Sequence, residues 1–208
     1  MLRRIVLVGS GALALSTVIM APGVAAAKPL TGTVSCVLKG SAVITPGLPL
    51  GTDQTAAKTY KSTTTFTGTL DQCSGEQQNI NTKKGYGPID HGTTTAVGTT
   101  KYKKGTVLPS CIALTSPTVP TVLKATTLFY DANNNLVGKT VAKLTVGPAT
   151  LTPTSFTSTG LVSGGNAFKK ENIVAYAQLV GDVAGACLGG TSTTFTFTDG
   201  ASYITVGQ

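Results

Sequence analysis

The sequence predicts an all-β fold, either an antiparallel β-sandwich or a closed β-barrel, in a single domain that spans residues 28–208. Threonine, which branches at Cβ and suits a pleated, half-buried strand, makes up about one in five of these residues. Strong helix formers are rare, since the same residues include two glutamates and no methionine or arginine. Short alternating segments recur at spacings of roughly 10–20 residues, which is typical of sandwiches and barrels.

About nine segments have a strand pattern. The clearest covers residues 60–73, where Phe66, Gly68 and Leu70 face one side and threonines face the other. The first segment is expected to be one long strand bent at Gly40, or a strand pair. The full set is 31–44, 60–73, 92–102, 121–130, 136–146, 150–159, 173–180, 193–198 and 201–206.

Turn residues indicate how these segments connect. Asp131 to Asn135 and Asp199-Gly200 each lie between two alternating runs, which predicts two hairpins. Pro153 places the segment 150–159 at a sheet edge, because proline cannot donate to a ladder. The remaining assignments are surface loops at 74–90 and 163–166 and a central strand at 173–180.

Residues 1–27 have the composition of a secretory signal peptide. Arg3 and Arg4 supply a positive start, residues 5–20 are apolar and uncharged, and Ala25 to Ala27 supply small residues for cleavage. We therefore expect a signal helix that is removed after Ala27, and a mature protein that is secreted, extracellular or associated with the cell envelope. Glycine and serine dilute the apolar run, so stable membrane insertion is not expected.

The charge of the mature part limits the classes of partner. After residue 27 the chain has fourteen lysines against eight acidic residues, which gives a net charge of +6, and it has no arginine. Because specific nucleic-acid recognition relies on the planar guanidinium group, no nucleic-acid partner is expected. A lysine-rich surface suits loose contact with an anionic cell-envelope polymer, and another secreted protein is the alternative partner.

The cysteines indicate a covalent framework. All four, Cys36, Cys73, Cys111 and Cys187, follow residue 27, and an even number in an exported chain indicates two disulfides. Three pairings are possible. We favour Cys36–Cys73 and Cys111–Cys187, because Cys36 lies in the first strand segment and Cys73 ends the next. No two cysteines have the short spacing of a zinc site, so no metal is expected.

Neither a catalytic site nor a cofactor is expected. His91, the single histidine, follows Asp90 in a loop-like stretch and is expected to be exposed there, not to act as a general base. Asp131 to Asn135 offers oxygen ligands at short spacing, but it lacks the glutamate of a calcium loop and is explained as a turn. A small secreted hydrolase that uses two of the eight carboxylates, with tyrosine or His91, is an alternative.

A candidate contact patch combines lysines, which attract anions, with tyrosines, which offer flat amphipathic faces. It consists of Lys83, Lys84, Tyr86, Lys101, Tyr102, Lys103 and Lys104. These residues are the basis for expecting contact with an envelope polymer.

Several motifs resemble those of the small Thr/Gly-rich, four-cysteine secreted proteins of actinobacteria. They are Val34-Ser35-Cys36, the run from Phe66 to Leu70 that leads to Cys73-Ser74-Gly75, and the closing run from Thr194 to Gly200. The resemblance implies an exported β protein from a high-GC Gram-positive bacterium, and it implies no particular activity or functional residue. Tyr130 to Asn135 with Gly138 also resembles an immunoglobulin-like hairpin.

These features predict a secreted, non-enzymatic β protein that works by surface contact, at the cell envelope or outside it. The small hydrolase is one alternative. An outer-membrane β-barrel is the other, because its strands alternate in polarity as well.

Overall fold

The computed structural model describes residues 28–49, 54–108, 119–146, 155–180, 193–197 and 200–207. The predicted signal peptide lies outside these residues, and no helix among them has the length and apolar character needed to cross a membrane. They include a short 3-10 helix, η1 (Thr82–Lys84). The strands are β1 (Thr31–Gly32), β2 (Val34–Thr45), β3 (Tyr60–Ser74), β4 (Gln77–Gln78), β5 (Ile89–Tyr102), β6 (Thr121–Asp131), β7 (Leu136–Val146), β8 (Ser155–Gly165), β9 (Asn172–Gln178), β10 (Thr193–Phe197) and β11 (Tyr203–Val206).

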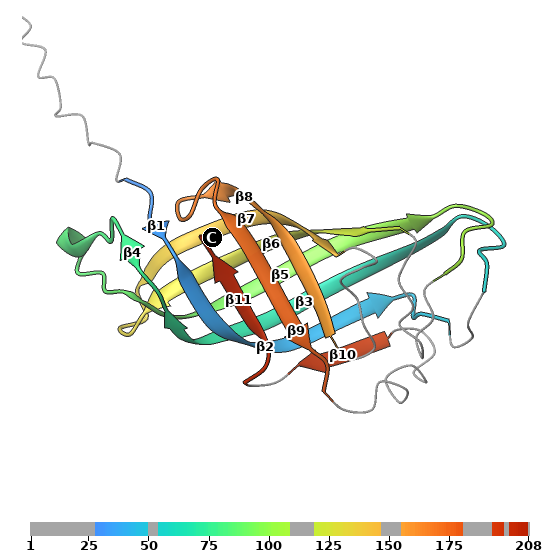
Figure 1. Ribbon diagram of the computed structural model, residues 1–208, viewed down its shortest axis with the longest axis horizontal. Coiled ribbons are helices and arrows are strands. Elements are labelled where there is room, and N and C mark those ends of the chain that lie inside the picture. Colours follow the sequence, from blue (N-terminus) through green and yellow to red (C-terminus); the bar gives the residue numbers. More distant parts are fainter. Residues whose placement is uncertain are drawn as a thin grey trace, which may run out of the picture.

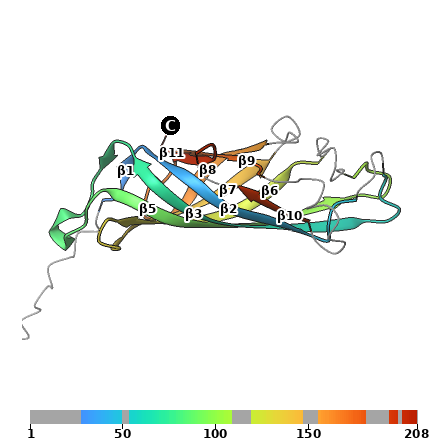
Figure 2. The same ribbon diagram turned by 90° about the horizontal axis from the view of Figure 1, so that it is seen from below.

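The long strands form a closed antiparallel barrel with eight positions (Figure 1). Around the barrel, β2 is followed by β3, β5, β6, β7, β8 and β9, and β11 and β10 then close the ring back to β2. The all-β prediction is therefore confirmed, and of the two expected architectures the structure has the closed barrel. Outside the ring, β1 and β4 pair with each other as a small ribbon (Figure 1), and β1 lies at one end of the barrel (Figure 2).

β10 and β11 share one position in the ring. β10 pairs with Gly40–Ile44 of β2, and β11 pairs with Val34–Val37 of the same strand. The two strands therefore follow one another along β2 and do not pair with each other, so the hairpin predicted at Asp199-Gly200 is wrong. The physical reason is that β2 is long and each of its halves needs an apolar neighbour to complete the barrel wall.

β8 also differs from its prediction. It begins at Ser155 and continues to Gly165, through residues that were expected to form a loop. A register shift between Val141 and Ala142 of β7 lets these small residues stay in the ladder. β8 pairs with β7 on one side and β9 on the other, so its predicted edge position is wrong. β9 has partners on both sides, which confirms the expected central strand.

The barrel interior is apolar because the strands alternate in the way the sequence predicts. On β3, Phe66 and Leu70 point inward and are buried, whereas the threonines between them are exposed. Gly40 and Gly68 lie opposite each other on β2 and β3. A Cβ at Gly40 would collide with the carbonyl oxygen of Thr67, so glycine permits the close approach of these strands at the point where β2 changes partner.

The two ends of the barrel are built differently. At one end, which we call the base, Leu30 and Phe168 close the interior. The backbone N–H of Phe168 donates to the carbonyl oxygen of Leu30 at 2.6 Å, and the Phe168 ring packs edge-on against Phe129 with ring centroids 5.8 Å apart. At the other end, which we call the mouth, the described residues beyond the strand ends include 46–49 after β2, 54–59 before β3 and 103–108 after β5.

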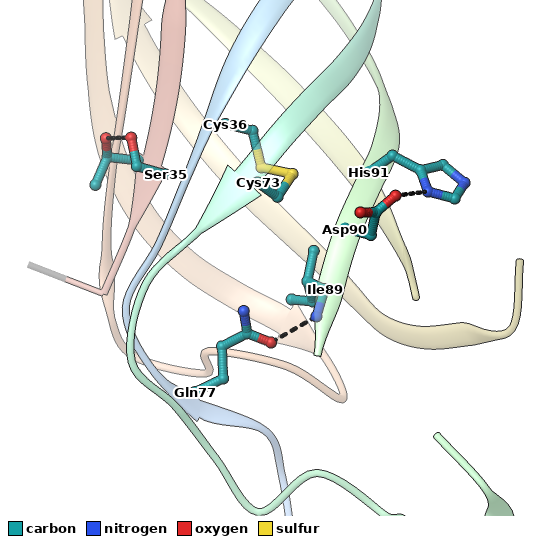
Figure 3. Close-up of a disulfide and its surroundings, with 8 residues drawn as sticks. Ser35, Cys36, Cys73, Gln77, Ile89, Asp90 and His91 are labelled. Atoms are coloured by element: carbon teal, nitrogen blue, oxygen red, sulfur yellow. Dashed lines mark hydrogen bonds and ion pairs between the residues drawn. A yellow bond between two sulfur atoms is a disulfide. The ribbon is translucent and has the colours of Figure 1, made fainter. Parts of the chain in front are cut away.

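A disulfide joins β2 to β3 near the base (Figure 3). Cys36 and Cys73 have Cα atoms 4.1 Å apart, and Cys36 is buried in the main core. The structure thus contains the first favoured pair. Cys111 and Cys187 lie outside the described residues, so their pairing stays a prediction. A structural disulfide is typical of an oxidising compartment.

Candidate functional site

The structure does not bring the seven residues of the predicted contact patch together. Lys83 and Lys84 belong to η1 at the base, and Tyr86 follows them. The other four lie at or beyond the far end of β5, a strand of 14 residues. Tyr102 is 3% exposed and belongs to a small buried cluster, so its ring is not a contact surface.

His91 lies within β5, because that strand begins at Ile89 and not at residue 92 as predicted. The loop assignment is therefore wrong for Asp90 and His91, although the His91 side chain is only partly buried. Both ring nitrogens are engaged, Nδ1 with Asp90 at 3.0 Å (Figure 3) and Nε2 with Asn134 at 3.1 Å. The ring also stacks on Tyr130. This arrangement leaves neither nitrogen for a substrate or a nucleophile.

Asp131 serves the backbone of the hairpin between β6 and β7. Its carboxylate accepts hydrogen bonds from the backbone N–H groups of Gly87, Asn133 and Asn135 and from the Asn135 side chain, at 2.9–3.0 Å. The N–H of Gly87 and the Asn135 side chain are the main causes that lower the pKa of Asp131 to about 2. Asn134 adopts a positive φ of 60°, which confirms the predicted turn. Among the described residues no group of three possible metal ligands occurs.

The mouth of the barrel contains an apolar cavity of about 100 Å³. Its walls come from strands on both sides of the barrel and from the connection that follows β2, and the described lining residues are all uncharged. They are Ala42, Ile44, Leu48, Ser62, Thr64, Phe66, Thr100, Tyr102, Thr121, Leu123, Val146, Phe156, Leu179 and Phe195. The alternation of each strand explains this lining, since it aims apolar and small residues inward.

Two of the hydroxyl groups around this mouth cavity are paired with each other. Thr100 and Thr121 share a hydrogen bond of 2.6 Å between their hydroxyls, and the described residues include no buried side-chain polar atom without a partner. Burial raises the pKa of Tyr102 to about 12, so its phenol stays neutral. The backbone N–H of Leu48 donates to the Thr193 hydroxyl at 3.0 Å and holds Leu48 against the cavity. The site therefore suits an uncharged, apolar group.

A second, smaller void of about 20 Å³ lies deeper in the barrel. It shares Phe66, Leu123 and Phe156 with the mouth cavity, so these three side chains separate the two spaces. The rest of its described wall is formed by Leu38, Thr94, Ala96, Leu144, Ser158, Ala175 and Ile204.

The base carries a different cavity, of about 230 Å³, on the outer side of the Leu30 plug. Several amide side chains there use one atom to hold the scaffold: Gln77 accepts from the Ile89 backbone N–H, and Asn79 donates to the Thr31 hydroxyl. The described residues that line it are Lys28, Pro29, Leu30, Gln77, Asn79, Ile80, Asn81, Lys84, Tyr86, Gly87, Leu136, Val137 and Asn166. This base cavity offers amides, a tyrosine and two lysines, which suits a polar ligand.

The predicted contact patch includes Lys84 and Tyr86 of the base cavity and Tyr102 of the mouth cavity, but the sequence did not indicate a cavity at either end. The inward alternation of Phe66, Phe195 and their neighbours was visible in the sequence. It identifies an apolar interior but does not reveal that one end of this interior is incompletely filled, because that depends on how the strands are spaced around the ring.

Comparison with known proteins adds no further constraint: no family model, no curated protein and no solved structure matches this chain.

Proposed function

We propose that this chain is an exported, non-enzymatic binding protein that holds the apolar part of a small molecule in the mouth of its barrel. The observation that carries the proposal is the mouth cavity, whose described lining is uncharged and largely apolar and includes the paired hydroxyls of Thr100 and Thr121. Barrels of eight strands are just wide enough either to be filled by side chains or to hold one small ligand. In this barrel, side chains fill the interior at the base, and the mouth keeps space for a small ligand.

The size of the cavity limits the ligand. Its volume of about 100 Å³ is below that of an engineered apolar cavity of roughly 150 Å³ that stays dry and binds benzene. The mouth therefore suits a short hydrocarbon group, with the remainder of the ligand outside the barrel. Export is supported by the signal-like composition of residues 1–27 and by the Cys36–Cys73 disulfide.

Titration with 1-hexanol, followed by backbone amide NMR shifts, tests this function. Wild-type protein is expected to show saturable shifts at residues around the mouth, such as Leu123 and Val146. Thr64→Phe places a ring in the cavity and is expected to abolish saturation. The matched control is Thr65→Phe, because Thr65 is exposed on the outer face of the same strand. Equal binding by the wild type and Thr64→Phe would contradict the proposal.

The residues on the outer face of the barrel support the view that water, and not lipid, surrounds it. Lysines occur on that face within the strands, since Lys124, Lys139 and Lys143 have exposed side chains. A lipid-facing barrel has the opposite arrangement, with an apolar band outside, and a lysine near the middle of such a band costs about 2–4 kcal/mol. This distribution favours a secreted or envelope-associated barrel over the outer-membrane alternative.

Contact with an anionic polymer of the cell envelope is the second candidate function, and the base cavity favours it. Lys28 and Lys84 can attract anionic groups, and Tyr86 and the nearby amides suit hydroxyl-bearing units. Retention of the purified protein on isolated cell wall at low salt tests this function. Lys84→Ala with Tyr86→Ala is expected to lower retention, whereas Lys124→Ala on the barrel wall is not. Absence of wild-type retention would contradict it.

A further inference from the structure

We propose that the ligand group held in the mouth is a linear alkyl chain and that Phe156 sets the length of chain the barrel accepts. This inference rests on the proposed function, and it assigns a specificity-determining residue to that site. It follows from the way the mouth cavity and the deeper void are arranged, from the aromatic residues between them and from the polarity of the deeper walls.

The two spaces lie in line along the barrel. On β2 the mouth cavity contacts Ala42 and the deeper void contacts Leu38, while on β5 the corresponding residues are Thr100 and Ala96. Both pairs are inward residues four positions apart, which is roughly 13 Å along a strand. The deeper void is therefore a continuation of the mouth cavity toward the base.

Aromatic rings form the floor between these spaces. Phe66 stacks on Phe197 with ring centroids 5.1 Å apart, and Phe156 contacts the same ring edge-on at 5.8 Å. Phe197 is fully buried and Phe66 nearly so, whereas Phe156 is only partly buried. Phe66 and Phe156 are the two rings that border both spaces, and Phe156 is the less buried of the two.

The walls below this floor suit methylene groups. Leu38, Leu144 and Ile204 supply aliphatic surface. The two hydroxyls in the wall are paired, since Thr94 shares a hydrogen bond of 3.0 Å with Thr127 and Ser158 donates to the Ala175 carbonyl oxygen at 3.5 Å. No described polar group there is available to a polar ligand. A narrow, apolar, in-line path admits a linear chain and excludes a ring.

Binding of a homologous series of linear 1-alkanols tests the proposal, with the affinity plotted against chain length. In the wild type the affinity is expected to rise about fourfold per methylene until the chain reaches the Phe156 ring, and then to level off. Phe156→Ala is expected to continue the rise to longer chains. Phe156→Trp is expected to level off at a shorter chain than the wild type.

Two controls keep the test decisive. Leu161→Ala changes an exposed side chain on the outer face of β8, with 50% of its surface accessible, and is expected to keep the wild-type profile. Phe156→Leu, which retains most of the apolar volume, is expected to give a profile between the wild type and Phe156→Ala if the alanine variant folds poorly. Cyclohexylmethanol, a ring-bearing probe, is expected to bind more weakly than 1-heptanol.

The outcomes separate this inference from the function on which it rests. Unchanged chain-length profiles in all Phe156 variants, or equal binding of cyclohexylmethanol and 1-heptanol, would overturn the inference and leave the mouth as a binding site. Failure of the wild type to bind any alkanol would instead overturn the proposed function.

Discussion

The base and the mouth are opposite ends of the same strands, and among the described residues the barrel interior is plugged at the base and keeps an apolar cavity at the mouth. The base has the Leu30 and Phe168 plug, the Cys36–Cys73 disulfide and the four hydrogen bonds of Asp131. The mouth has an apolar cavity whose walls have no charge. The contrast teaches that the contacts fastening the described barrel and the cavity to which we propose to assign a ligand can lie at different ends of the same strands.

The largest loss of stability is expected when the Phe168 side chain of the plug is removed. Phe168 is fully buried, so Phe168→Ala should lower the free energy of unfolding by about 3–5 kcal/mol. Phe156→Ala should lower it by only about 1–2 kcal/mol, because this ring already borders empty space and is partly exposed. Denaturant unfolding of both variants measures the difference. Equal losses would mean that the two ends contribute alike to stability.

A smaller effect is expected from loss of the base disulfide. Cys36 and Cys73 are 37 residues apart in the sequence, and replacing both with alanine should lower the free energy of unfolding by about 2–4 kcal/mol. Reduction of the wild-type protein, which would also break a Cys111–Cys187 bond, should lower the free energy of unfolding by at least as much. Peptide mapping without reduction tests the other predicted bond, Cys111–Cys187, and free thiols at both positions would contradict it.

The smallest effect on stability is expected from a change in pH, which acts through Asp131 in the turn at the base. Because the pKa of Asp131 falls from 3.8 to about 2 on folding, the unfolded chain binds this proton more readily than the folded chain. The stabilisation is therefore complete above about pH 4 and is lost as the pH falls toward 2. Unfolding experiments from pH 2 to 7 measure it, and Asp131→Asn should have a flatter profile. Parallel profiles would exclude Asp131 as the cause.

The strands that could be predicted from the sequence are those in which local pattern and final environment agree. Phe66, Gly68 and Leu70 alternate with threonine, and they occupy the interior face of β3. Asp131 and Asn134 have the chemistry of a turn, and they form one. In both cases the local pattern is sufficient to predict the conformation.

The features that could not be predicted depend on partners far away in the chain. Asp199-Gly200 has the local pattern of a hairpin, but β10 and β11 each pair with β2, 149–172 residues earlier. The residues of the predicted contact patch are separated for a similar reason. Lys84 and Lys101 are close in sequence, yet they lie near opposite ends of β5. The mouth cavity depends on packing around the whole ring, which no single segment encodes.

The shared position of β10 and β11 also constrains the order of folding. β2 begins at Val34, whereas the strands that close the ring against it end at Val206. The barrel therefore cannot close until residues 193–206 have been synthesised and released, and this long-range pairing favours slow closure. Such a delay suits a chain that crosses a membrane in an unfolded state, because the emerging polypeptide has no complete barrel to unravel before it reaches the far side.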